Sequence, residues 1–404
     1  MTAWRDMRDG AAEIRYVAPP EVCAVIESLG RTEDVRFSPD GRRLALAAFN
    51  RNRIAVFDID VSRSAAGAGI AVTGAVEISS PALRRPHGID FIDADTLVVA
   101  NREGDVALFA VPPACAGGTC RELTPIHVRR AGDGRLLKEP GSVRVAGGSG
   151  RAREIFVCNN AAHSVTRHSL GAGGRSIGRG EILLQKWLDV PDSVGVSEDG
   201  RWIAVSNHNT HAVLLYENSP SLTPASDPDG LLRGVRYPHG LRFSADGSSI
   251  LLADAGAPYV HVYARGGQGW HGLHYPVASL RVMDDALFQR GRSSPQDGGP
   301  KGLDIDPALN LLVITSECQT MAFFDLPQIL DGTACHPDLP SHRQHQALQL
   351  RCELEIAAQS RQAQLHAEAK AARAKAKLAA MRASPSWRLA KPLRWLGKAL
   401  GRPS

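Results

Sequence analysis

The 404-residue sequence predicts an all-β fold, a six-bladed β-propeller, followed by a long α-helix and a short basic amphipathic helix. One unit recurs six times: a corner, an alternating strand, an Asp-Gly-type turn, a second strand ending in Asn or Asp, and a third strand. Spacings of roughly 47 to 62 residues between corners are typical of propeller blades. The corners begin at Thr32, Pro86, Pro140, Pro191, Pro238 and Pro300.

The fourth unit shows the local pattern. Large apolar residues alternate with small ones along 194–196 and 203–205, and Asp199 followed by glycine supplies the turn between these strands. The same turn chemistry occurs at Asp40 and Asp246. Because one blade cannot bury both faces of its sheet alone, the repetition predicts a ring of stacked sheets.

The predicted propeller covers residues 14–335. No further strand is evident after 321–326, whereas two short apolar segments, 14–16 and 22–26, precede the first unit. We therefore expect residues 14–28 to supply the outer strand of the last blade, which leaves no sheet edge open.

The C-terminal part of the chain differs in composition. Residues 342–404 hold 13 Lys and Arg against 3 Asp and Glu, whereas the whole chain carries a net charge of +5, so the propeller is acidic overall. Ser341 can cap a helix that runs without Gly or Pro to Ala383. This Ala-rich helix at 341–383 would either self-associate as a coiled coil or remain a solvated single helix.

Residues 384–404 are predicted to form a basic amphipathic tail. A Leu face, two indoles and a cationic face together are typical of a helix that lies on an anionic membrane surface. Packing on a partner protein is the alternative, and no nucleic-acid partner is expected. The residues are Trp387, Arg388, Leu389, Lys391, Leu393, Arg394, Trp395, Leu396, Lys398 and Leu400.

The expected location is the cytoplasm, with peripheral association at the inner membrane. The N-terminus lacks the apolar segment of a secretion signal, and no stretch reaches the roughly 20 apolar residues of a membrane span. The seven Cys show no zinc-type spacing. Cys115 and Cys120 would bridge a loop in an oxidising compartment, but reduced thiols are expected here.

The propeller corners carry the candidate site residues. Aligning them places one residue from each blade at an equivalent position, and these residues should converge on the axis, where His and carboxylate groups suit metal binding or acid–base chemistry. The aligned residues are Glu33, His87, Gly141, Asp192, His239 and Lys301.

Two kinds of ligand fit this set. Glu33, Asp192 and His239 are the predicted ligands of one divalent metal ion (Mg, Mn, Zn or Ca), and His87 and His239 are the candidate proton-transfer groups. Lys301 argues for the alternative, an anionic ligand held by its ammonium and by protonated His.

The ends of the second strands supply further candidates for binding a polar or sugar-like ligand: Asn101, Asn159, Asn207 and Asp254. The alternative is that these side chains hydrogen-bond their own backbone, as turn residues do. His208 and His211 follow Asn207 in a loop-like stretch, and we expect both to be exposed.

The Pro-His-Gly corners, the Asp-Gly turns and the Asn or Asp strand ends resemble the six-bladed β-propeller superfamily of gluconolactonases, senescence-marker proteins and NHL-repeat proteins. The resemblance covers residues 14 to about 330 and implies a divalent metal, with Glu33 matching the family glutamate by position. The family's Pro-Asn-Gly corner reads Pro-His-Gly at His239, and Asp192 and Lys301 also depart from its pattern.

The tail has a resemblance of its own. The Ser-Trp-Arg-Leu-x-x-Pro-Leu-Arg segment at 386–394 is similar to a C-terminal segment of many bacterial glycosyltransferases and companion proteins of cell-surface polysaccharide synthesis. Two functions are therefore expected. The first is a membrane-associated binding or scaffold propeller that meets a polar ligand or a partner protein at its mouth. The alternative is a metal-dependent, lactonase-like hydrolase or lyase.

Overall fold

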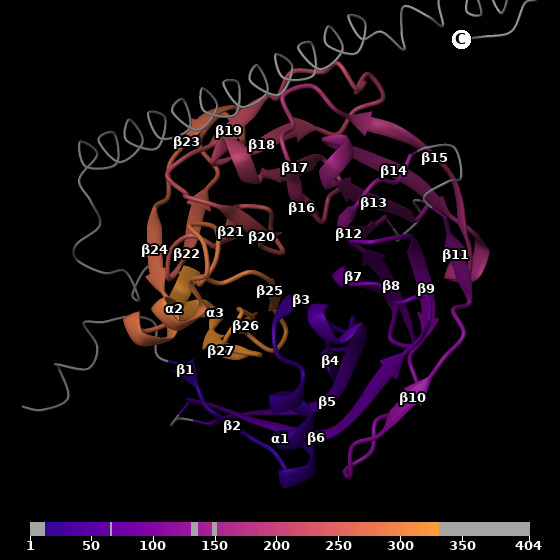
Figure 1. Cartoon of the computed structure of the whole chain (residues 1–404). Helices are drawn as coiled ribbons and strands as arrows, with labels where there is room; N and C mark the ends of the chain where they lie inside the picture. The colour runs from indigo at the N-terminus through magenta and orange to yellow at the C-terminus, as the bar shows by residue number, and fades with distance from the viewer. Residues whose placement is uncertain (1–12, 65–66, 131–135, 148–151, 331–404) are drawn as a thin grey trace, which may run out of the picture. The chain divides into compact units, whose positions relative to one another are not determined.

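The computed structural model describes residues 13–64, 67–130, 136–147 and 152–330. These residues form six mainly antiparallel sheets, which surround a central axis as the blades of a propeller (Figure 1). The prediction of an all-β, six-bladed propeller is confirmed. The predicted helix at 341–383 and the basic tail at 384–404 lie outside the described residues.

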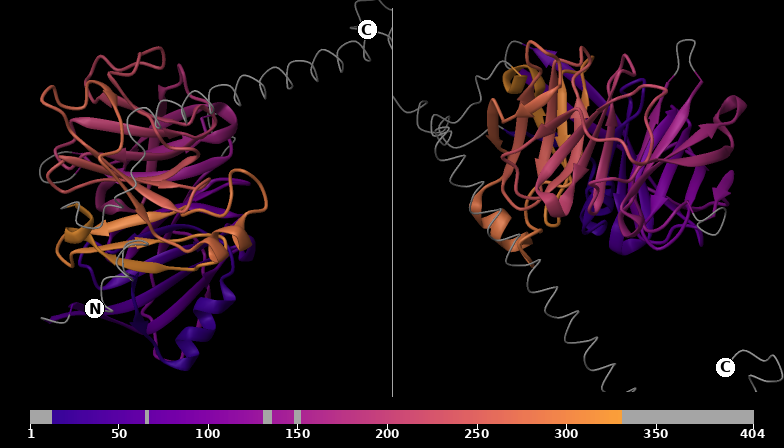
Figure 2. Two further views of the ribbon diagram at one scale, coloured as in Figure 1. Left: turned by 90° about the vertical axis from the view of Figure 1, so that its left-hand side faces the viewer. Right: turned by 90° about the horizontal axis from the view of Figure 1, so that it is seen from above.

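Each blade is built from the axis outward, and its first two strands form a hairpin that follows one of the predicted corners. The strands run along the axis of the ring rather than around it (Figure 2). The innermost strands are β3 (Thr32–Phe37), β7 (Pro86–Asp93), β12 (Pro140–Ala146), β16 (Pro191–Val196), β20 (Pro238–Phe243) and β25 (Leu303–Asp306). The second strands are β4 (Arg43–Ala48), β8 (Thr96–Asn101), β13 (Glu154–Asn159), β17 (Trp202–Asn207), β21 (Ser249–Asp254) and β26 (Leu311–Ile314).

The outer half of each blade holds a third strand and a fourth. The third strands are β5 (Arg53–Ser64), β9 (Val106–Ala110), β14 (Ser164–Leu170), β18 (Ala212–Glu217), β22 (Tyr259–Ala264) and β27 (Ala322–Asp325). The fourth strands are β6 (Gly67–Ser79), β11 (His127–Arg129), β15 (Ile177–Leu184), β19 (Gly230–Leu232), β24 (Ala278–Arg281) and β1 (Glu13–Ile14).

The sixth blade takes its outermost strand from the N-terminal part of the chain. β1 pairs antiparallel with β27, with Glu13 opposite Phe324 and Ile14 opposite Phe323. The rest of the expected closing segment 14–28 does not join this sheet: β2 (Tyr16–Val17) pairs with β6 of the first blade. The expectation that residues 22–26 belong to the closing strand is wrong, because these residues lie in the helix α1 (Pro20–Ser28).

The sequence of α1 explains this difference. Pro20 stands at the first helical position, where its missing N–H costs no hydrogen bond. Val22 and Ile26 are four residues apart, so they lie on one face of the helix and pack into the core between the first and sixth blades.

Two short strands tie neighbouring blades together at the rim. β10 (Cys120–Glu122), from the connection after β9, pairs in parallel with β6, and β23 (Gly272–His274) pairs in parallel with β19.

Cys115 and Cys120 are free thiols. Besides α1, the described residues contain the helices α2 (Asp285–Gly291) and α3 (Leu326–Leu330) and the 3₁₀ turns η2 (Phe49–Arg51), η3 (Asn160–Ala162), η4 (Ala172–Gly174) and η5 (His208–Thr210). In the described part of the chain, no helix has the length and apolarity needed to cross a membrane.

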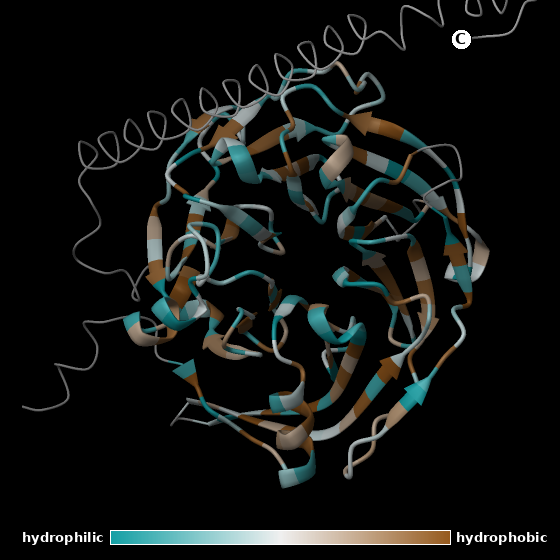
Figure 3. Cartoon of the chain, in the orientation of Figure 1, coloured by the Kyte–Doolittle hydropathy of each residue, from teal (hydrophilic) through white to brown (hydrophobic). Residues whose placement is uncertain are grey.

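The hydrophobic core lies between adjacent blades. Val98 of β8 and Val143 of β12, for example, belong to one buried cluster and come from the second and third blades. Hydrophobic residues accordingly follow the strands, and hydrophilic residues gather in the turns (Figure 3). Burying one such side chain contributes about 1.5–3 kcal/mol, so each blade is stabilised largely by its two neighbours.

Candidate functional site

Five of the six innermost strands begin with a bulge, which redirects their corner residues. The pairing register shifts between Pro86 and Gly88, between Pro191 and Ser193, and again at the start of β12, β20 and β3. A bulge bends the strand and redirects its side chains. At each bulge, the corner residue therefore does not follow the in-and-out alternation of the side chains in the rest of the strand.

The structure brings the predicted corner residues together. The Oε2 atom of Glu33 lies 3.7 Å from His87 Nε2 and 3.5 Å from His239 Nε2. His239 Nε2 is also 3.3 Å from Asp192 Oδ2, and the rings of His87 and His239 stack with centroids 5.5 Å apart. We name Glu33, His87, Asp192, His239 and Lys301 the axial cluster.

Lys301 is engaged by carboxylates. Its Nζ lies 3.0 Å from Glu317 Oε1, 3.4 Å from Asp297 Oδ1 and 3.7 Å from Glu33 Oε2. Burial acts to lower the pKa of Lys301, but Glu33 and Glu317 outweigh it and raise the pKa above its ordinary value. The ammonium thus already has its counter-charges, which disfavours the anionic ligand that sequence reasoning gave as the alternative.

Asp192 is held by groups that sequence reasoning did not select. Asn160 Nδ2 donates a hydrogen bond of 2.9 Å to Asp192 Oδ1, and Arg102 Nη1 lies 3.5 Å from the same oxygen. His208 Nδ1 lies 3.6 Å from Asp192 Oδ2. Asn160, Arg102 and His208 each follow the Asn at the end of a second strand by one residue, a regularity that could have revealed them.

The expectation that His208 is exposed is wrong. His208 is only 5% exposed and contacts the side chain of Gln296 at 2.9 Å through Nε2. His211 is half-buried, and its Nδ1 contacts the backbone carbonyl of Arg236. The turn η5 directs His208 inward as soon as β17 ends, which a loop assignment cannot predict.

The protonation of His87 follows from its neighbours. Its Nδ1 lies 2.5 Å from the carbonyl oxygen of Gly141, which can only accept, so Nδ1 carries the hydrogen. Burial lowers the pKa of His87 to about 3, so the ring is neutral. The lone pair of Nε2 therefore faces Glu33 Oε2, a buried oxygen without a hydrogen-bond partner.

This arrangement fits a metal ion. One ligand atom from each of Glu33, His87 and His239 lies within 4.8 Å of the others, and all three residues are buried. A neutral imidazole that donates its other N–H to a backbone carbonyl is the usual state of a metal-ligating His. Imidazole and carboxylate ligands together suit Zn, Mn or Fe better than Ca.

The axial cluster is closed to solvent in this conformation. Its side chains are 0–5% exposed. The connection between α2 and β25 covers it, because Gln296 contacts His208, and Asp297 lies 3.9 Å from Arg31 and 3.4 Å from Lys301. A substrate could reach these groups only if this connection moved.

The predicted ligand-binding residues at the ends of the second strands have a structural role instead. Each side chain accepts a hydrogen bond from the backbone N–H two residues before the corner proline of its own blade. The pairs are Asn101 with Arg84 at 3.0 Å, Asn159 with Lys138 at 3.0 Å, Asn207 with Asp189 at 2.6 Å and Asp254 with Arg236 at 2.8 Å.

The corners need this support because of their backbone. Arg85, Glu139 and Val190 each precede a corner proline and have φ of 51°, 52° and 53°, a region that side chains other than Gly disfavour. The carboxamide fixes the peptide beside the strained residue. The turn interpretation of Asn101, Asn159, Asn207 and Asp254 therefore replaces the ligand-binding one.

Asn159→Ala should accordingly destabilise the protein without touching the axial cluster. The Asn159 side chain accepts from Lys138 N–H and donates to Val157 O and Thr166 Oγ1. Leaving these buried groups unpaired should lower the free energy of unfolding by about 1–3 kcal/mol, measured by urea denaturation. Asn209→Ala, at an exposed position, is the control; equal losses in the two variants would contradict the structural role.

A second ring of charged residues follows the axial cluster. It lies three residues further along each innermost strand, and sequence reasoning missed it, although the same alignment of corners contains it. We name it the inner charged ring: Arg36, Asp90, Arg144, Gly195, Arg242 and Asp304.

Comparison with known proteins finds a family model that matches part of the chain. The family model described as the Lipoprotein LpqB beta-propeller domain (Gmad1) matches residues 1–124. No curated protein matches the chain. Among solved structures, a functionally unknown protein from Desulfotomaculum acetoxidans DSM 771 is similar, with 12% identity, 70% of this chain and 79% of that chain covered, and a TM-score of 0.45. Hydrazine Synthase from Kuenenia stuttgartiensis is similar, with 15% identity, 85% and 87% coverage, and a TM-score of 0.46.

Proposed function

We propose that this chain is a β-propeller binding or scaffold protein whose axial cluster holds one divalent metal ion. The observation that carries the proposal is the buried Oε2 of Glu33, which accepts no hydrogen bond and which the Nε2 lone pair of His87 faces at 3.7 Å. The ammonium of Lys301 also lies 3.7 Å from this oxygen but is shared with Glu317 and Asp297, so the oxygen accepts no hydrogen bond and a metal ion would give it a ligand partner. Glu33, His87 and His239 would be the ligands, with Asp192 beside them.

The burial of the cluster favours a scaffold over a hydrolase. A catalytic metal keeps a coordination position open to substrate, whereas a structural metal is enclosed by protein. The candidate ligands come from β3, β7 and β20, that is, from the first, second and fifth blades. A metal here would link blades across the axis and stabilise the folded ring, because it binds only the folded arrangement. The lactonase-like alternative would need the covering connection to open.

Elemental mass spectrometry tests the proposal. Purified protein that has been offered Zn²⁺ and Mn²⁺ and then dialysed should hold close to one metal ion per chain. A variant with Glu33, Asp192 and His239 all changed to Ala should hold none. Metal-free wild-type protein after this treatment would exclude the axial metal and leave the ring without that link.

We also propose that residues 384–404 attach the protein to an anionic membrane surface, in the setting of bacterial cell-surface polysaccharide synthesis. The support is the sequence pattern of Leu, Trp and basic residues. The matching family model is described as a lipoprotein domain, which is compatible with a membrane setting. A polar or sugar-like ligand or a partner protein would then meet the propeller at that surface.

Removing residues 384–404 tests the attachment. The full chain should float with vesicles that contain phosphatidylglycerol, and each basic residue near such a surface should add about 1 kcal/mol to binding. The truncated chain should stay in solution with an unchanged melting temperature. Vesicles of phosphatidylcholine alone are the control. Equal flotation of both chains would exclude the tail as the anchor.

A further inference from the structure

The inner charged ring alternates in sign except at one blade. In order around the axis it reads Arg36, Asp90, Arg144, Gly195, Arg242 and Asp304. The two acidic members are each flanked by arginines. Gly195 of β16 stands where the alternation would place the third acid. The ring therefore has a position without a carboxylate between Arg144 and Arg242.

The two existing acids show what such a carboxylate does. Asp90 Oδ2 accepts a hydrogen bond of 2.7 Å from Val145 N–H of the next blade and lies 3.5 Å from Arg144 Nη1. Asp304 Oδ2 accepts from Phe37 N–H of the next blade at 2.9 Å, and its Oδ1 accepts from Arg242 Nε at 2.6 Å. Each acid thus contacts an arginine of the ring. It also accepts a hydrogen bond from a backbone N–H in the next blade, that of the residue immediately after the ring residue of that blade.

The groups that would serve a third acid are in place around Gly195. Arg144, Arg242 and Phe243 line, together with Gly195, a cavity of about 40 Å³. Phe243 follows the ring position of β20, as Val145 and Phe37 do in their strands. This volume suits a compact ion and excludes an extended ligand.

Arg242 has one nitrogen left over. Its Nε donates to Asp304 and its Nη1 donates to the carbonyl of Leu241 at 2.6 Å, but its Nη2 is buried and has no hydrogen-bond partner. The residue is 4% exposed. A buried charged donor without an acceptor is costly, so this nitrogen marks a place for a negative group; the Glu198 carboxylate also lines the cavity but makes no hydrogen bond to it.

We propose that the gap beside Gly195 binds a small oxyanion, a carboxylate or a phosphate group, which completes the inner charged ring. The anion would accept hydrogen bonds from Arg242 and Arg144 and from the backbone of Phe243, and it would join the third, fourth and fifth blades. Charge-assisted hydrogen bonds of this kind are the strong ones in proteins.

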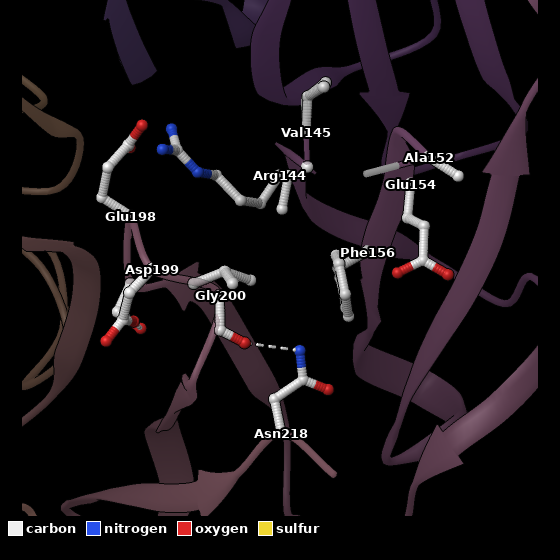
Figure 4. Close-up of a pocket in the computed structure, with 13 residues that line it drawn as sticks. Arg144, Val145, Ala152, Glu154, Phe156, Glu198, Asp199, Gly200 and Asn218 are labelled. Atoms are coloured by element: carbon white, nitrogen blue, oxygen red, sulfur yellow. Dashed lines mark hydrogen bonds between the residues drawn. The ribbon is translucent and has the colours of Figure 1, made fainter. Parts of the chain in front are cut away.

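A second cavity gives the gap an approach from solvent. It measures about 550 Å³, and both cavities are lined by Arg144, Val196 and Glu198. Figure 4 shows the Arg144 side chain extending along this cavity toward Glu198. Glu198 is exposed and negative, so it competes with an entering anion. A larger ligand could therefore place its anionic group in the gap and the rest of the molecule in this second cavity.

Isothermal titration of the full chain with inorganic phosphate, and separately with acetate, tests the proposal. At least one anion should bind saturably, and comparing the two separates phosphate from carboxylate. Arg144→Gln should weaken binding at least about tenfold, because a charge-assisted hydrogen bond is lost. Glu198→Gln should strengthen it by removing the competing charge. Arg121→Gln, the same change on an exposed edge strand, should leave affinity unchanged.

Two results would overturn the proposal: no saturable binding of either anion, or equal affinity in wild type and Arg144→Gln. The binding should persist in Glu33→Gln, which separates it from the axial metal. Gly195→Asp should abolish it, because the variant carries its own carboxylate. A Cβ at Gly195 lies 2.5 Å from Leu241 Cδ1, so that side chain must shift. If Gly195→Asp does not fold, Arg144→Gln decides.

Discussion

Asp304→Ala is expected to lower the free energy of unfolding by about 3–5 kcal/mol, a larger loss than Asn159→Ala should cause. Asp304 of the sixth blade binds Arg242 of the fifth and the backbone N–H of Phe37 in the first. Arg242 is buried, so removing the carboxylate leaves a buried guanidinium without its counter-charge. Urea denaturation followed by tryptophan fluorescence measures the loss.

The control for this variant is Asp60→Ala, the same change at an exposed position, which should alter stability by no more than about 0.5 kcal/mol. Changing Arg242 to Met together with Asp304 to Asn should recover part of the loss, since no charge is then stranded. A loss below about 1 kcal/mol in Asp304→Ala would show that Arg242 finds another partner and that the pair does not hold the blades.

Glu33→Gln is expected to weaken metal binding at least about 100-fold, because changes even to groups behind a metal ligand cost 10–100-fold. The substitution keeps the shape of the side chain and removes its charge. The Oε2 atom that His87 and His239 face would become part of a neutral amide, which is a poor metal ligand. Competition with a chromophoric chelator for Zn²⁺ measures the affinity.

Glu317→Gln is the matched control. It removes a carboxylate from the same end of the axis, 3.0 Å from Lys301, but Glu317 is not among the groups that gather around His87 and His239. Its metal affinity should stay within a few-fold of the wild type. Equal weakening in both variants would mean that the overall negative charge attracts the metal and that no defined ligand set exists.

The sequence predicts the architecture well because each repeat of the sequence corresponds to one blade. Six corners at similar spacing give six blades, and each corner residue is placed relative to its own strand. Glu33, His87, Asp192 and His239 could therefore be expected to meet, although up to 206 residues separate them in the chain. Convergence on an axis is a property of the fold, so one alignment of corners suffices to predict it.

Side-chain partners could not be predicted in the same way. From the sequence, Asn159 and Asn207 suit ligand binding and hydrogen bonding to their own backbone equally well. The structural role becomes clear only from the positive φ of the residues that precede the corner prolines. His208 lies in a stretch that resembles a loop, yet η5 turns it inward. Five of the six positions of the inner charged ring hold Arg or Asp, but they lie in strands whose apolar residues dominate the sequence pattern.

The pairing of β1 with β27 determines when the propeller can finish folding. Ile14 can pair only after Phe323 has been made, roughly 300 residues later in the chain. At ribosomal speeds of about 5–20 residues per second, the first blade, which ends at Ser79, is made about 12–50 s before the strand that completes the ring. Such long-range contacts form slowly, so the segment before α1 remains open to other chains until β27 has been made. A chaperone that shields the early blades would act during this interval.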